Sequence, residues 1–438
     1  MRDRATGEGA PGAVVTPWGN SADLKERRLQ PGAGTPRVEV VRNQRDRLFG
    51  AVVATVSEKG YEATTVADVV ELSGVSRSAF YEHFANKAEC LAAAAAELID
   101  PTLEALAKAP KDSPDPAEAA FARFIELLCS QPAAARACFV ELDAAGEVGE
   151  VVLDRAFETL ASFAEGLGAE TRGERLDPEL ARALFRGLRK LIHTRVYRGQ
   201  VRELEGLAPE LWRWLSNVTA PPRELEQPRR QRPLLTGRFE GYTPGERIAR
   251  AVAAVLAEKG YLQMSTDDIA ARAAISLSTF YAHYADKRDA VLGALEMSGA
   301  QIMALAVPAA RRAGGWQEGV RALYEAICAY FSAEPEMARL ALVGVYGAGP
   351  RALSRRDRVI DSLAEMLAPG FEENPGSPTV TAEAAAATVY ALMREQVRRQ
   401  GPESLPAIVP LATYVTLAGF VGPERACAVA NGESRPKR

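Results

Sequence analysis

The sequence contains one motif twice, 200 positions apart. The run Glu58-Lys59-Gly60-Tyr61 recurs at 258–261. Between 45–92 and 245–292, 16 of 48 positions are identical and the alignment needs no gap. Unrelated segments of ordinary composition would share about one position in fifteen. The 438-residue chain therefore consists of two copies of one unit, and both copies are expected to fold in the same way.

The first helix of each copy is predicted from the spacing of its apolar residues. Leu48, Ala51, Val52 and Val56 recur at helical intervals, and the second copy repeats the pattern. A lysine and a glycine follow in both copies, and this pair is typical of a helix C-terminus. Each copy is therefore expected to open with an amphipathic helix.

Two further helices are predicted from their caps. Residues 65–68 and 265–268 both fit the capping-box pattern, so a short second helix is expected to begin there. Ser76 and Ser276 then follow a tight turn as the predicted N-caps of a third helix. A helix, a short turn and a second helix form the arrangement that presents its second helix to the DNA major groove.

The residues that carry this pattern resemble a known family. In the first copy these are 64–70, 73–76, 79–84 and Lys87, and in the second 268–270, 274–276, 278–284 and Lys287. They resemble the N-terminal domain of the tetracycline-repressor (TetR) family of transcriptional regulators. The resemblance implies an all-α chain with two TetR-like units in tandem. Each unit would have a three-helix helix-turn-helix DNA-binding domain and an all-helical regulatory and dimerisation domain.

The resemblance also implies which residues contact DNA. Those at the positions of Thr65, Tyr81, His83 and Lys87 touch phosphates or hold the recognition helix, and Lys87, at the start of a fourth helix, is expected to face a phosphate. Arg77 is expected to contact a base directly, because its guanidinium can hold guanine O6 and N7. The full set of expected DNA-binding residues is Thr65, Ser76, Arg77, Ser78, Ala79, Tyr81, His83, Lys87, Ser265, Ser276, Leu277, Ser278, Thr279, Tyr281, His283 and Lys287.

The second motif departs from the first at two places. Ala274 replaces Gly74, which costs about 1 kcal/mol if the turn requires a positive φ. Leu277 replaces Arg77. Three alternatives remain for the second module: it reads a different half-site, it binds weakly, or it has lost contact with DNA.

Basic residues precede each motif. Those before the first motif are Arg37, Arg42, Arg45 and Arg47. Those before the second motif are Arg229, Arg230, Arg232 and Arg238. Such arms can follow the DNA backbone or enter the minor groove, and a solvated linker without contacts is the alternative. The net charge of −4 gives no support to DNA binding by itself, so the proposal depends on local charge.

The remaining chemistry does not indicate an enzyme, and no metal or cofactor is expected. The sequence contains no HExxH, GxSxG or nucleotide-binding glycine loop. Its five cysteines are scattered, which predicts small core residues in a reducing cytoplasm. His193 lies in a stretch of apolar and basic residues and is interpreted as a core or interface histidine. No stretch reaches roughly 18 uninterrupted apolar residues. The expected location is the bacterial cytoplasm, in association with the nucleoid.

Gly/Pro content and the repeat together predict the domain boundaries. They are a disordered tail at 1–36, a first DNA-binding domain at 37–90, a first regulatory domain at 91–218, a linker at 219–243, a second DNA-binding domain at 244–290, a second regulatory domain at 291–425 and a tail at 426–438.

The regulatory domains suggest how the chain would work. In the family, this part holds a small-molecule effector, and its last two helices form a four-helix interface with a partner copy. The candidate helices here are 178–199 with 206–217, and 380–400 with 403–421. Few aromatic residues occur there, which would fit an apolar effector. One chain could form a pseudo-dimer on an imperfect palindrome, or two chains could form a homodimer.

Two functional hypotheses follow. The first is a ligand-responsive repressor that binds double-stranded DNA. The second is an all-helical ligand-binding or protein-interaction protein in which one or both DNA-binding modules are degenerate, and Leu277 together with the acidic net charge are its best support.

Overall fold

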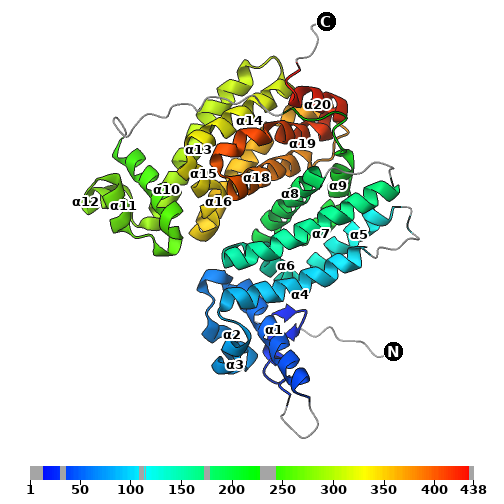
Figure 1. Cartoon of the computed structure of the whole chain (residues 1–438), viewed down its shortest axis with the longest axis vertical. Coiled ribbons are helices and arrows are strands. Elements are labelled where there is room, and N and C mark those ends of the chain that lie inside the picture. The colour runs from blue at the N-terminus through cyan, green and yellow to red at the C-terminus, as the bar shows by residue number, and fades with distance from the viewer. Residues whose placement is uncertain are drawn as a thin grey trace, which may run out of the picture. The chain divides into compact units, whose positions relative to one another are not determined.

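A computed structural model describes residues 13–29, 36–107, 113, 115–171, 178–226 and 243–433 of the chain (Figure 1). Apart from one short hairpin, the regular elements of these residues are helices, as the resemblance to the TetR family implies. The chain divides into two compact units. One contains Met1–Phe163 and Ile192–Ala208, and the other contains Ala164–Leu191 and Pro209–Arg438.

The first copy of the repeat begins with a short hairpin and continues in helices. Its elements are β1 (Val15–Thr16), β2 (Gly19–Asn20), η1 (Ser21–Asp23), α1 (Arg37–Ala63), α2 (Val66–Ser73), α3 (Arg77–His83), α4 (Lys87–Ala107), α5 (Pro116–Ser130), α6 (Pro132–Phe139), η2 (Glu141–Ala145), α7 (Glu147–Thr171), α8 (Pro178–Tyr197) and α9 (Glu203–Asn217). The regular part of α1 ends at Gly60, where φ is +81°, as the lysine–glycine pair predicts.

The second copy follows the same order. Its elements are α10 (Pro244–Gln263), α11 (Thr266–Ala273), α12 (Leu277–His283), α13 (Lys287–Arg312), α14 (Trp316–Ala333), α15 (Pro335–Leu342), η3 (Gly344–Ala348), α16 (Pro350–Glu365), α17 (Ala368–Glu373), α18 (Thr381–Gln400), η4 (Pro402–Ile408), α19 (Val409–Val421) and α20 (Pro423–Ala430). Thr243 caps α10 in a capping box with Glu246.

The predicted disordered tail at 1–36 is wrong for residues 13–29. The strands β1 and β2 pair in an antiparallel hairpin, and the fully buried Leu24 follows it. The rings of Trp18 and Phe49 lie 5.3 Å apart. The segment is ordered because Leu24 is buried against α1 and Trp18 packs on Phe49, contacts that its Gly/Pro content did not reveal.

The predicted tail at 426–438 also needs correction. Helix α20 continues to Ala430, and the side chains of Ala426, Cys427 and Val429 are buried. The predicted linker at 219–243 is packed over its first residues as well. Tyr414 donates a hydrogen bond to the carbonyl of Thr219 at 2.7 Å. The rest of the linker, 227–242, lies outside the described residues.

The compact units do not follow the repeat, because parts of α8 and α9 lie in the second unit. Gly187 of α8 is so close to Thr388 of α18 that a Cβ there would collide with it. Trp214 of α9 is fully buried, and its ring lies next to Gly419 of α19. The second unit therefore has a core to which the last helices of both copies contribute.

Among the residues that the structure describes, two segments are long and apolar enough to cross a membrane when judged by length and composition alone. They are α13 and the stretch Pro402–Val421. Within the second unit, 72% of the most apolar window of Pro402–Val421 is buried, and 39% of the window in α13 is buried. The burial of most of the Pro402–Val421 window is typical of a core helix in a packed bundle.

The five cysteines are buried free thiols, which confirms their interpretation as small core residues. Burial raises the pKa of the Cys90 and Cys328 thiols. His193 is buried as well, and its ring stacks on Tyr197 at 6.0 Å.

Candidate nucleic-acid interface

Local hydrogen bonds hold the helix-turn-helix of the first copy. Thr65 Oγ1 accepts from the Asp68 amide at 3.2 Å, and the Asp68 carboxylate accepts from the Thr65 amide at 2.7 Å. Gly74 ends α2 with φ at +64°. Ser76 Oγ then accepts from the Ala79 amide at 3.2 Å. The predicted capping box and N-cap are confirmed, and together they set the angle at which α3 leaves the turn.

The outer face of α3 is open to solvent. Phe80 is fully buried beneath the helix, whereas Tyr81 is 48% exposed. Arg77 and Ser78 are also exposed. The Arg77 guanidinium lies 5.8 Å from the centre of the Tyr81 ring. An arginine and a tyrosine are therefore presented together, free of contacts that would bury them.

The second copy builds the same framework with a different face. Ser265 and Asp268 form the capping box of α11, and Ser276 caps α12. Tyr281 is 54% exposed and Leu277 is 40% exposed, while Ser278 is also exposed. The face of α12 therefore offers an apolar side chain where α3 offers a cation.

Ala274 adopts the left-handed conformation, with φ at +50° and ψ at 51°. It is the one non-glycine residue with positive φ among the residues described. The turn after α11 thus requires the conformation that glycine adopts most readily, as the comparison with Gly74 predicts.

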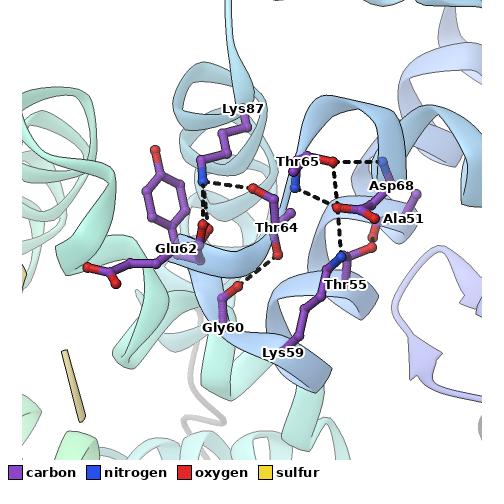
Figure 2. A network of polar contacts seen from close by, with 10 residues as sticks. Ala51, Thr55, Lys59, Gly60, Glu62, Thr64, Thr65, Asp68 and Lys87 are labelled. Carbon is purple, nitrogen blue, oxygen red and sulfur yellow. Dashed lines mark hydrogen bonds and ion pairs between the residues drawn. The ribbon is translucent and has the colours of Figure 1, made fainter. Parts of the chain in front are cut away.

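Lys87 is engaged by the end of α1 (Figure 2). Its Nζ donates to the carbonyls of Tyr61 at 2.7 Å and Thr64 at 2.8 Å, and it lies 4.2 Å from the centre of the Tyr61 ring. Burial lowers the pKa of Lys87. The ammonium therefore joins α4 to α1 instead of pointing freely at a phosphate, and phosphate binding there remains a prediction for the backbone amides of α4.

Lys287 repeats this arrangement in the second copy. Its Nζ donates to the carbonyls of Tyr261 at 3.1 Å and Met264 at 2.9 Å. The identity of the lysine in both motifs therefore has a structural reason that does not depend on DNA.

His83 lies at the end of α3 and joins it to α1. Its Nε2 is 3.1 Å from Oε1 of Gln44, a residue that the sequence patterns did not single out. Burial and the nearby Arg45 charge lower the pKa of His83. His283 is exposed, so the two histidines differ in their surroundings.

The basic residues before the first motif have separate roles. Arg47 is buried, and its NH1 donates to the carbonyl of Ser73 at 2.8 Å. The Arg45 guanidinium lies 5.3 Å from the centre of the Phe49 ring. Arg37 and Arg42 are exposed. The basic cluster before the second motif, at 229–238, lies outside the described residues.

Glu141 of η2 is a residue that sequence reasoning missed. Its carboxylate accepts from the Tyr61 amide at 2.7 Å and pairs with Arg136 at 2.8 Å. Burial raises the pKa of Glu141. No local pattern indicates this contact, because 80 residues separate Glu141 from Tyr61.

A comparison with protein families identifies the repeated domain. The model of bacterial regulatory proteins of the tetR family matches residues 51–94 and 248–293. The chain carries the TetR-family DNA-binding domain twice, in tandem. In each TetR-type module the match covers the capped helix, the turn and the exposed recognition helix. A search of curated proteins found no match.

Solved structures that are similar to this chain cover about 40% of its length. The fatty acid degradation regulator FadR from Bacillus halodurans is 18% identical, with 42% of this chain and 98% of that chain covered and a TM-score of 0.37. PfmR from Thermus thermophilus is 22% identical, with 39% and 96% covered and a TM-score of 0.32. FadR from Bacillus subtilis, solved in complex with stearoyl-CoA, is 13% identical, with 40% and 98% covered and a TM-score of 0.34.

Proposed function

We propose that this TetR-family protein is a ligand-responsive transcriptional repressor whose two fused modules act as a pseudo-dimer on an imperfectly palindromic operator. The observation that carries the proposal is the pair of open but unlike recognition faces, with Arg77 on α3 and Leu277 on α12. Two identical reading heads suit a perfect palindrome. Two unlike heads in one chain suit half-sites that differ.

The core of the second unit supports pairing within one chain. Lys190 of α8 donates to Asp357 of α16 at 2.8 Å, and both side chains are buried. Glu210 of α9 accepts from the Thr379 amide at 2.7 Å. The last helices of the first copy thus have specific partners in the second copy, as the subunits of a dimer would have in each other.

The contacts at the end of α1 support a route for regulation. Tyr61 is bonded through its carbonyl to Lys87 of α4 and through its amide to Glu141 of η2. An effector that shifted α4 or η2 would therefore move the end of α1. We propose that an apolar small molecule acts in this way and shifts the population between DNA-competent and DNA-incompetent states.

The test is a footprint on the DNA upstream of the chain's own coding sequence. Wild type should protect a site with half-sites about one helical turn apart. Arg77→Ala should weaken binding at one half-site, by about 1–3 kcal/mol if the arginine holds a guanine. Arg202→Ala removes an exposed arginine outside the recognition helices and should leave the footprint unchanged.

Light scattering on the same sample tests the pseudo-dimer. The proposal expects one chain bound to one operator. Absence of any binding at low salt would favour the alternative, an all-helical ligand-binding or protein-interaction protein with degenerate DNA-binding modules. A particle of two chains would reject the pseudo-dimer and retain the regulator.

A further inference from the structure

The segment 13–29 packs on the first module at Gly50. In the second module, a side chain fills the matching position. Leu24 is fully buried, and its side chain packs where Gly50 of α1 has no Cβ. A Cβ at Gly50 would lie 3.0 Å from Leu24 Cδ2. The matching residue of the second copy is Arg250, which pairs with Glu334. The absence of a side chain at position 50 is therefore a feature of the first module that makes room for this segment.

A chain of hydrogen bonds fixes the backbone of the segment to the helix-turn-helix. Asn43 Nδ2 donates to the carbonyl of Arg27 at 2.9 Å. Arg47 Nε donates to Asn43 Oδ1 at 3.1 Å, and Arg47 NH1 donates to the carbonyl of Ser73 at the end of α2. The residues around Arg27 are thus linked by two side chains to the start of the turn.

Lys25 lies directly against that turn. A Cβ at Gly74 would be 3.0 Å from Lys25 Cγ and 3.4 Å from Lys25 Cα. The second copy has Ala274 at this position. Two of the differences between the motifs, at positions 50 and 74, thus fall where the segment touches the first module.

The docked segment carries cations beside the turn that precedes the recognition helix. Lys25 and Arg28 are exposed, and the Arg28 charge is near enough to contribute, after burial, to a lowered pKa of Arg47. The guanidinium of Arg27 lies over Gly19. Two acidic residues, Asp23 and Glu26, share the stretch 23–28, which retains one net positive charge. The turn that Lys25 contacts leads within three residues to Arg77.

We propose that residues 13–29 form an accessory DNA-contact element of the first module, in which Lys25 and Arg28 bind backbone phosphates beside the groove that α3 enters. The ligand is the phosphodiester backbone of double-stranded DNA. Phosphate contacts position a protein on the duplex without reading bases, and compact cations next to a reading head serve this purpose. The inference rests on the proposed DNA binding and adds an asymmetry to it, since the position of Gly50 is filled in the second module.

The experiment measures the affinity of the full chain for the upstream duplex over a series of salt concentrations. Each lost phosphate contact lowers the slope of log affinity against log salt by about one. Lys25→Gln should therefore lower the slope by about one, and Lys25→Gln with Arg28→Gln by about two. The control Arg202→Gln also removes one exposed cation and should leave the slope unchanged.

A second variant tests the docking itself. Gly50→Arg places the residue of the second module where Leu24 packs. It should lower the salt slope by about as much as Lys25→Gln with Arg28→Gln. Circular dichroism should show that the helices remain intact. Arg77→Ala serves as the reference for base reading. If Arg77→Ala weakens specific binding while the Lys25 and Gly50 variants keep the wild-type slope, the accessory element is refuted and the regulator stands. If wild type does not bind the duplex, both are refuted.

Discussion

At the scale of single residues, the turn before each recognition helix shows how one Cβ adds backbone strain at positive φ. Gly74 and Ala274 occupy the same left-handed conformation, with φ at +64° and +50°. A residue with a Cβ is strained there by about 1 kcal/mol or more. The second module therefore forms the same turn at a higher energy.

Ala274→Gly is expected to stabilise the chain by about 1 kcal/mol, because glycine relieves the strain at positive φ. Chemical unfolding monitored by circular dichroism gives the free energy. Ala271→Gly in the exposed face of α11 is the matched control, and it should destabilise by a similar amount because glycine is unfavourable inside a helix. If both substitutions lowered the free energy of unfolding equally, Ala274 would not be strained in the wild-type protein.

The capping aspartates predict a dependence on acid. Hydrogen bonds from Lys59 and Thr65 lower the pKa of Asp68 to about 2, and those from Lys259 and Ser265 lower the pKa of Asp268 to about 2. The folded state therefore binds fewer protons than the unfolded state between about pH 4 and pH 2. The stabilisation is complete above this range and is lost as the pH falls through it. Unfolding of wild type and Asp68→Asn should differ at pH 6 and converge near pH 2.

At the scale of elements, the end of α1 is a junction. Lys87 of α4 binds its carbonyls, and Glu141 of η2 accepts from the Tyr61 amide. In the second copy η3 begins with Gly344, which packs against Leu256 of α10. The first residue of this 3-10 helix is thus a buried carboxylate in the first module and a glycine against an apolar side chain in the second.

Glu141→Ala is expected to destabilise the first module by about 1–3 kcal/mol, because it leaves the Tyr61 amide and Arg136 without their acceptor. Glu141→Gln keeps an acceptor and should cost less. Burial raises the pKa of Glu141, so the folded state binds more protons than the unfolded state, and this residue's contribution decreases as the pH rises through the raised pKa. Unfolding of both variants between pH 4 and pH 8 measures the effect, and an unchanged wild-type profile in Glu141→Ala would contradict it.

At the scale of the molecule, the second unit combines helices from both copies of the repeat. Asp357 of α16 pairs with Lys190 of α8 at 2.8 Å and with its neighbour Arg356 at 2.8 Å. The exposed fractions of the Lys190 and Asp357 side chains are 6% and 3%. Charges at such depth require their partners, so the pairing of the two copies is specific as well as apolar.

Asp357→Asn is expected to destabilise the chain by about 3–5 kcal/mol, because two buried cations lose their counter-charge. Thermal and chemical unfolding provide the measurement. Glu126→Gln breaks the exposed pair with Arg123 and should change the stability by less than about 1 kcal/mol. Similar effects of the two substitutions would mean that the buried pair does not hold the copies together.

The sequence by itself determined the features that depend on neighbours in the chain. The capping boxes at Thr65 and Ser265, the caps at Ser76 and Ser276, and the turn strained at Ala274 all involve residues within four positions of each other. Their hydrogen bonds are local, so a short pattern is enough to predict them. The exposed face of α3 follows from the same helix, because burial of Phe80 turns Arg77 and Tyr81 outward.

Only the tertiary structure decided which distant residues meet. Leu24 packs against Gly50, and the Tyr61 amide donates to Glu141. Lys190 donates to Asp357, which lies 167 positions further along the chain. The physical reason is that hydrophobic burial has no direction along the sequence: a pattern indicates which face is buried and leaves open what buries it. Buried polar groups that are far apart in the sequence form hydrogen bonds only where the packing brings them within reach of each other.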